Sequence, residues 1–210
     1  MLMTYIQIIG CGFFFLSTIV LGIFLRKYPS EKVLKITTII LHSIGLVALL
    51  VPLVIGLFYP GISSYDRLLG IPPLPYRPLA VATGALLAPI AIFFLFTSWL
   101  GIVGLGQGQP GINLTKKLVD ELVYKTSRNP MSFGFYIGCI ALGLLAGSTY
   151  FLLWSLIEII PTHIFFLKFF EELELKLRFG KSYIEYKERV PFLIPRIRGS
   201  SRNKYVNNNA

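Results

Sequence analysis

Long uncharged stretches constrain this chain more than any other feature. Five of them are almost free of charged residues, and they cover residues 5–25, 36–58, 79–103, 131–148 and 149–170. About 20 residues of α-helix cross the hydrocarbon core of a bilayer, where a helix satisfies its own backbone polar groups. The sequence therefore predicts an all-α fold, a transmembrane bundle of five spans with short cytosolic helices at its C-terminal end.

The composition and the division of the chain fit this class. Charged residues make up only 14% of the chain, whereas soluble domains carry about a quarter. Residues 5–25 lack the basic start and the cleavage site of a secretory signal, so we interpret them as a span. We expect three spans in residues 1–104, a site region with two spans in residues 105–198, and a disordered polar tail at 199–210.

The placement of basic residues predicts the topology. Four Lys or Arg residues lie within 26–35, two within 59–77, four within 116–128 and ten from residue 168 onward. Because cytosolic loops are enriched in Lys and Arg, the N-terminus is expected outside and the C-terminus in the cytosol. The net charge of +10 then serves contact with the anionic headgroups of the bilayer, and no nucleic-acid partner is expected.

The cysteines and histidines indicate no metal centre. Cys11 and Cys139 lie in apolar stretches without CxxC spacing, which is typical of small buried residues. His42 and His163 are far apart in the sequence, so we expect no zinc site and no metal partner. For His163, which follows Pro161, packing or capping of a freed carbonyl is favoured over a role as a base.

The first part of a candidate site opens the fourth predicted span. Arg128 precedes Asn129-Pro130, and this pair is typical of a helix start whose free N–H groups favour a carboxylate. The guanidinium of Arg128 offers a fork suited to the same group. The alternative for Arg128 is a simple anchor that follows the positive-inside rule.

The second part lies where the last span ends. A tight turn at Gly147-Ser148 forces residues 131–170 into a hairpin, which returns Glu171 and Glu172 to the face where Arg128 begins. Adjacent carboxylates are costly without cations or donors nearby. They either form a solvated helix face or bind a ligand with an amino group and hydroxyls, such as S-adenosylmethionine.

The order of these motifs resembles a known family. The chain carries Arg128-Asn129-Pro130-Met131, a membrane hairpin, then FEE, FGKSYIEYKER and VPFLIP. This order is similar to that of the integral-membrane methyltransferases, which include isoprenylcysteine carboxyl methyltransferase and the phospholipid N-methyltransferases. The resemblance covers about residues 104–198 and implies S-adenosylmethionine as the methyl donor and a lipid or lipidated acceptor, either a phospholipid amine or an isoprenylcysteine carboxylate.

The resemblance also implies a set of cofactor-binding residues. A glycine-rich stretch at 104–111 is by itself no more than a flexible connection, but the family has a similar stretch ahead of RNPM that is proposed to touch the cofactor. No catalytic residue is indicated. The residues implied for the cofactor are Gly106, Gln107, Tyr124, Arg128, Asn129, Pro130, Met131, Glu171 and Glu172.

The chain departs from the family pattern at several positions. Leu122-Val123 stands where the family has Gly-Pro, Lys125 replaces an arginine, and Ser132 replaces a tyrosine. These departures favour, as one alternative, a non-catalytic membrane protein of the same fold. A second alternative is a membrane sterol reductase that uses NADPH, whose C-terminal half is similar, although Met131-Ser132 and the Glu171-Glu172 pair argue against it.

The sequence also makes local predictions. Residues 59–78 are rich in Pro and Gly and are predicted to form an outer loop without regular helix. Residues 118–123 are predicted to form a short surface helix. Residues 183–189 are predicted to form another, with Ser182 and Glu185 as a capping box.

Glu158 is a further candidate, because it lies deep in the fifth span, where an ionisable residue is costly. Either Glu158 lines the path of the lipid substrate or it joins helices through a hydrogen bond. At some 13 residues before Glu171, or about 20 Å along a helix, it is not expected to act in the transfer itself.

Overall fold

The computed structural model describes residues 2–108 and 114–196, and it is built from α-helices without a strand in those ranges. The N-terminal part contains α1 (Leu2–Lys27), α2 (Glu31–Gly45), η1 (Leu46–Leu50), α3 (Val51–Gly56), η2 (Leu57–Gly61), α4 (Ser64–Leu69), α5 (Arg77–Leu100) and η3 (Gly101–Leu105). The C-terminal part contains η4 (Leu122–Lys125), α6 (Pro130–Ala146), α7 (Thr149–Trp154), η5 (Ser155–Ile159), α8 (Ile160–Phe166), η6 (Leu167–Glu171), α9 (Glu172–Phe179) and α10 (Lys181–Arg189).

Several of these elements join end to end into apolar rods. Four continuous helices are long and apolar enough to cross a membrane, namely Leu2–Lys27, Glu31–Gly61, Arg77–Leu105 and Thr149–Phe179. The fourth predicted span is the shorter apolar helix Pro130–Ala146, which has 17 residues. The predicted all-α membrane bundle is therefore confirmed, and the chain is a multi-pass membrane protein.

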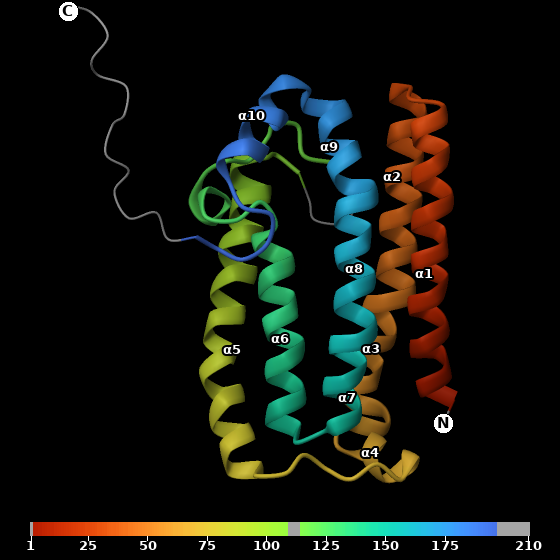
Figure 1. The fold of residues 1–210 in the computed structure, drawn as a ribbon, viewed down its shortest axis with the longest axis vertical. Helices are drawn as coiled ribbons and strands as arrows, with labels where there is room; N and C mark the ends of the chain where they lie inside the picture. The colour runs from red at the N-terminus through yellow and green to blue at the C-terminus, as the bar shows by residue number, and fades with distance from the viewer. Residues whose placement is uncertain (1, 109–113, 197–210) are drawn as a thin grey trace, which may run out of the picture.

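The rods stand side by side in Figure 1, with α7 to α9 between α6 and the N-terminal helices. The turn between α6 and α7 and the short helix α4 lie at the lower end, whereas α9, α10 and the segment before α6 lie at the upper end. The two halves of the candidate site therefore meet at the upper end, as the hairpin predicts.

The helices α5 and α6 pack in close contact because small residues face each other. A Cβ added at Gly134 would come within 2.9 Å of the backbone nitrogen of Leu95, and one at Gly84 within 3.0 Å of the carbonyl oxygen of Ala141. A larger side chain at either position would push the two helices apart. This pair forms one wall of the bundle in Figure 1.

The lower end contains a feature that the sequence did not predict. Residues 59–78 were expected to lack helix, yet α4 (Ser64–Leu69) forms there, so that prediction is wrong. The reason is Asp66, a carboxylate that is only 4% exposed. It accepts hydrogen bonds from Thr149 N at 3.0 Å, Tyr150 N at 2.7 Å and Ser148 Oγ at 3.3 Å. Asp66 thus caps the start of α7, and this bond set holds α4 in place.

The predicted surface helix over residues 118–123 is also wrong. Residues 118–120 are not helical, and a 3₁₀ turn begins only at Leu122, in η4. Val119 and Val123 are buried, whereas Leu122 is 52% exposed and has a φ of +50°. A positive φ breaks any helix there, so the apolar residues reach the core from a turn rather than from one helix face.

The C-terminal helices match the sequence only partly. Arg178 pairs with Glu174 at 2.5 Å, as their spacing predicts, and Gly180 has the positive φ of a helix end. The capping box at Ser182 and Glu185 is wrong, because α10 begins at Lys181 directly after Gly180, without a side-chain cap. The predicted disordered tail at 199–210 lies outside the described residues.

Candidate active site

A cavity of about 530 Å³ opens between the upper ends of the helices. Its polar end is lined by Arg128, Glu171, Glu174, Arg178 and Tyr183, which come from the segment before α6 and from the helices η6 to α10. Its apolar end is lined by Phe14, Leu46, Leu49, Leu50 and Leu95, from α1, η1 and α5. One cavity therefore joins a charged end to an apolar end within the membrane-spanning helices.

The backbone around Arg128 is held by residues 190–196, which we call the C-terminal strap. Four hydrogen bonds join the two segments: Arg128 N to Pro191 O at 2.9 Å, Arg196 N to Thr126 O at 2.9 Å, Ser127 Oγ to Leu193 O at 2.8 Å and Asn129 Nδ2 to Phe192 O at 2.8 Å. The prolines of the strap keep it extended, so its carbonyl groups stay available to these donors. The strap thereby fixes the start of α6, where Asn129 is the N-cap and Pro130 the first residue.

The Arg128 side chain is buried and only partly satisfied. It is 9% exposed, and its Nη1 lies 2.9 Å from Oε1 of Glu172, which also contacts Lys187 Nζ at 2.5 Å. Within the described residues, Nε and Nη1 of Arg128 make no hydrogen bond of normal geometry. An unsatisfied buried guanidinium is costly, and a carboxylate in the cavity would satisfy it.

The two adjacent carboxylates have different surroundings. Glu172 does not line the cavity, since its oxygens are paired with Arg128 and Lys187. Glu171 lines the cavity and has no cation partner within the described residues. Glu171 is therefore available to a positively charged ligand group, while Glu172 orients Arg128.

A second charged pair borders the same polar end. Glu174 is only 2% exposed and pairs with Arg178, which also donates to the carbonyl oxygen of Thr115. Glu174, Arg178 and Thr115 all line the cavity. The i, i+4 spacing of Glu174 and Arg178 predicts their ion pair. The same spacing does not predict that the pair lines a cavity, because this depends on the fold that brings Thr115 beside α9.

Three tyrosines close the polar end. Tyr186 donates to the carbonyl oxygen of Tyr124 at 2.8 Å, and Tyr183 lies beside Arg128 at 3% exposure. Burial, and for Tyr183 also the carboxylate of Glu172, raises the pKa of Tyr183 and Tyr186 above that of a free phenol. Both phenols therefore stay protonated at neutral pH and serve as hydrogen-bond donors.

The remaining predicted residues divide into two groups. Tyr124, Asn129, Pro130 and Met131 line the cavity, as does Ser132. Gly106 and Gln107 do not line it within the described residues, and residues 109–111 of the glycine-rich stretch lie outside them. The carbonyl oxygen of Gly106 accepts from Lys116 N at 2.8 Å, so Gly106 shapes the loop that carries Thr115.

The buried polar residues deeper in the bundle also divide. Glu158 is half-buried in η5 and does not line the cavity, and its Oε2 has no hydrogen-bond partner among the described residues. His163 lines the cavity, and its Nδ1 lies 2.8 Å from the hydroxyl of Tyr136. Thr38 and His42 of α2 line it as well, and sequence reasoning missed them as candidates because nothing in the sequence links α2 to residues 128–186.

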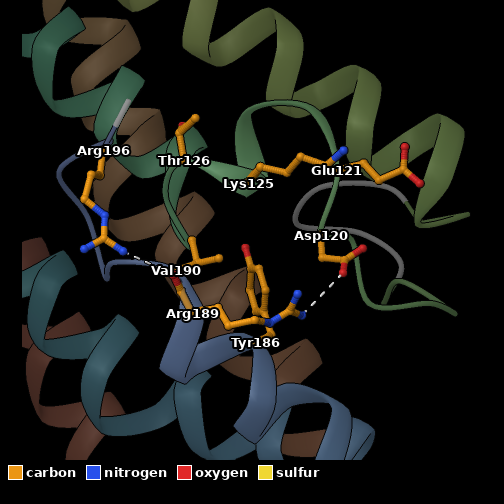
Figure 2. Close-up of a pocket in the computed structure, with 8 residues that line it drawn as sticks. All are labelled: Asp120, Glu121, Lys125, Thr126, Tyr186, Arg189, Val190 and Arg196. Atoms are coloured by element: carbon orange, nitrogen blue, oxygen red, sulfur yellow. Dashed lines mark hydrogen bonds and ion pairs between the residues drawn. The ribbon is translucent and has the colours of Figure 1, made fainter. Parts of the chain in front are cut away.

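A second cavity of about 620 Å³ lies on the same face and is shown in Figure 2. Its residues satisfy one another: Arg189 pairs with Asp120 at 3.8 Å, and Arg196 donates to the carbonyl oxygen of Arg189 at 3.4 Å. Tyr186 lines both cavities, so it forms part of the wall between them. Among the described residues, no group of three or more His, Cys, Asp or Glu could hold a metal ion.

The comparison with protein families identifies the part of the chain that carries this site. Residues 79–182, about half of the chain, match the phospholipid methyltransferase family. This match confirms the resemblance to the integral-membrane methyltransferases and indicates a membrane protein with methyltransferase activity. No curated protein and no solved structure gives a significant match to the chain.

Proposed function

We propose that this chain, a member of the phospholipid methyltransferase family over residues 79–182, transfers a methyl group from S-adenosylmethionine to a lipid-borne acceptor. The observation that carries the proposal is the single cavity that joins a charged end to an apolar end. A water-soluble donor and a membrane-soluble acceptor need these two surroundings, with the reacting atoms between them. Close approach of the two substrates with water excluded supplies much of the rate of such a reaction.

The polar end fits the amino-acid part of S-adenosylmethionine. The buried Nε of Arg128 has no hydrogen-bond partner among the described residues and matches a carboxylate, while Nη1 is held by Glu172. Glu171 lines the cavity without a cation partner in the described part of the chain and matches an ammonium group. Tyr183 adds a phenolic donor beside them. When bound, the cofactor would supply a methyl group activated by a positively charged sulfur, while these side chains bind and orient it.

The apolar end fits the chain of a lipid acceptor. Leu46 and Leu50, which line the cavity, are 49% and 40% exposed, so this wall of the cavity reaches the surface of the bundle that would face lipid. The acceptors implied by the family resemblance are a phospholipid amine and an isoprenylcysteine carboxylate. Either would reach the cavity sideways from the membrane.

The orientation of the site belongs to the same proposal. The upper end in Figure 1 carries the basic segments 26–35 and 116–128 together with α9 and α10. By the positive-inside rule this end faces the cytosol, which leaves the N-terminus outside. The cofactor would then reach the polar end from the cytosol.

Calorimetry of the purified protein with S-adenosylhomocysteine and, separately, with NADPH tests this proposal. We expect binding of the first compound only, and Arg128→Ala to weaken it about tenfold to a hundredfold because a charge-assisted contact is lost. Lys125→Ala is the matched control, because Lys125 lies three residues away, is exposed and lines only the second cavity. Binding of NADPH alone, or equal affinity in both variants, would contradict the proposal.

A further inference from the structure

Two polar residues of α2 face the cavity between its charged and apolar ends, outside the region that the family match covers. Thr38 is 1% exposed, and its Oγ1 has no hydrogen-bond partner among the described residues. His42 lies one helical turn later and lines the same cavity. A buried hydroxyl without a partner is costly, so a ligand group near Thr38 would be stabilised.

The hydrogen bond of His42 fixes which ring nitrogen carries the proton. Nδ1 of His42 lies 2.8 Å from the carbonyl oxygen of Thr38. A carbonyl oxygen only accepts, so Nδ1 must donate, and in the neutral ring Nε2 keeps a free lone pair. The partner of His163 is the Tyr136 hydroxyl, which can donate or accept, so that histidine is not fixed in the same way.

His42 also lies at a depth that suits the reacting atoms. Its ring meets Phe166 edge-on, with centroids 5.6 Å apart, and Phe166 is five residues before Glu171. Five residues correspond to about 7.5 Å along a helix. His42 is therefore level with the part of the cavity just below its charged end, unlike Glu158, which lies more than twice as far along the same rod.

We propose that Nε2 of His42 accepts the proton of the group that is methylated, so that the acceptor is a membrane-borne amine or hydroxyl rather than a carboxylate. This inference rests on the proposed function and names the acceptor class of the same site. A fixed lone pair attracts an N–H or O–H donor. It repels a carboxylate, which has no proton to give.

The transfer balances with His42 as the proton acceptor. The amine or hydroxyl heteroatom forms a bond to the methyl carbon while the carbon–sulfur bond breaks, and sulfur keeps that electron pair. The proton of the heteroatom moves to Nε2 of His42, so the positive charge lost at sulfur reappears on the imidazolium. General-base assistance of this kind contributes about 10²–10⁴-fold to a rate.

Nitrogen NMR on histidine tests the geometry directly, because His42 and His163 are the only two histidines in the chain. The protein is labelled with ¹⁵N-histidine, reconstituted in phosphatidylcholine nanodiscs and measured both without and with saturating S-adenosylhomocysteine, and a His163→Gln sample assigns the two rings. We expect His42 protonated at Nδ1 only, with an Nε2 resonance that moves when phosphatidylethanolamine or diacylglycerol is added and does not move with oleate. An Nε2-protonated His42, or an Nε2 resonance moved by neither lipid, would overturn the inference.

Turnover provides the second measurement. His42→Gln should keep the affinity for S-adenosylhomocysteine while kcat with the preferred lipid falls about a hundredfold. His163→Gln, which lines the same cavity, should lower kcat by less than about tenfold, the effect of one neutral hydrogen bond. Wild-type turnover in His42→Gln, or methylation of carboxylate lipids alone, overturns the inference. Loss of S-adenosylhomocysteine binding in the wild-type protein would instead overturn the proposed function, since the protonation state of His42 is measured without it.

Discussion

The two walls of the cavity differ in how they are built. The wall formed by the segment before α6 and by the helices η6 to α10 contains ion pairs, buried tyrosines and the C-terminal strap. The opposite wall, formed by α1, α2 and η1, is apolar except for Thr38 and His42. The first wall presents fixed charges suited to one ligand, whereas the second presents a surface that can vary with the acceptor. This difference suggests that donor binding and acceptor choice are properties of different parts of the chain.

The apolar wall, formed by α1, α2 and η1, is joined to the remaining helices by polar contacts at both ends of α1. At the upper end, Arg26 donates to the carbonyl oxygen of Phe169 at 2.6 Å and lies 3.9 Å above its ring. At the lower end, the buried Gln7 bonds to the hydroxyls of Tyr65 and Tyr150 at 3.1 and 3.0 Å. The cavity lies between these contacts, so the relative position of the two walls depends on them.

The largest effect should come from breaking the contact that Asp66 makes between α4 and the start of α7, at the same lower end. Asp66→Ala leaves the backbone N–H groups of Thr149 and Tyr150 at the start of α7 and one hydroxyl without their acceptor. We expect the free energy of unfolding to fall by about 3 kcal/mol, because both a helix cap and charge-assisted hydrogen bonds are lost. Titration of the reconstituted protein with a denaturing detergent would measure the change.

Asp66→Asn is the control, since its amide oxygen can still accept one of these hydrogen bonds and should restore part of the stability. The folded Asp66→Ala protein should still bind S-adenosylhomocysteine, because α4, which carries Asp66, lies at the end opposite to the start of α6 (Figure 1). Equal stability of wild type and Asp66→Ala would show that this contact does not fasten the two regions.

A smaller effect, on ligand affinity, is expected when a contact of the C-terminal strap with the segment before α6 is removed. Asn129→Ala removes the hydrogen bond to the Phe192 carbonyl oxygen and leaves the charge of Arg128 in place. Because Arg128 is then held less firmly, at a cost of about 1 kcal/mol, the affinity for S-adenosylhomocysteine measured by calorimetry should fall about fivefold. Ser127→Ala, which breaks a neighbouring bond to the strap without lining the cavity, should act in the same direction. If Asn129→Ala alone weakens binding, Asn129 contacts the ligand and does not act through the strap.

Much of the bundle and part of the site could be predicted from the sequence, because both depend on local patterns. Uncharged length predicts the spans, and a tight turn at Gly147-Ser148 requires the hairpin that returns Glu171 to Arg128. The i, i+4 spacing of Glu174 and Arg178 predicts their ion pair. These inferences need only helix geometry and the thickness of a bilayer.

The rest depends on contacts between distant segments. From the sequence, Asp66 is only a polar residue of a loop, because its role depends on the packing of α7 against α4. Thr38 and His42 likewise belong to an ordinary span, because their role depends on α2 lining the cavity. The separate surroundings of Glu171 and Glu172 follow from Lys187, fifteen residues after Glu172, which no local spacing rule connects to them. Apolar periodicity alone also misassigned residues 118–123, since it does not detect a residue with positive φ.

The smallest predicted effect concerns that residue, Leu122, at a position where the methyltransferase family pattern has glycine. Its φ of +50° lies in the left-handed region, where the Cβ of an L-residue costs about 1–2 kcal/mol. Leu122→Gly removes this strain but adds entropy to the unfolded chain, so we expect a net gain of about 0.5–1 kcal/mol in the free energy of unfolding. Leu122→Ala keeps the Cβ and is the matched control, which should not be stabilised. Because Leu122 is half-exposed and does not line the cavity, ligand affinity should change little in either variant. Equal stabilisation by alanine and glycine would show that the exposed leucine side chain, and not the backbone, is the unfavourable feature, and the polar wall would then be free of strain at this turn.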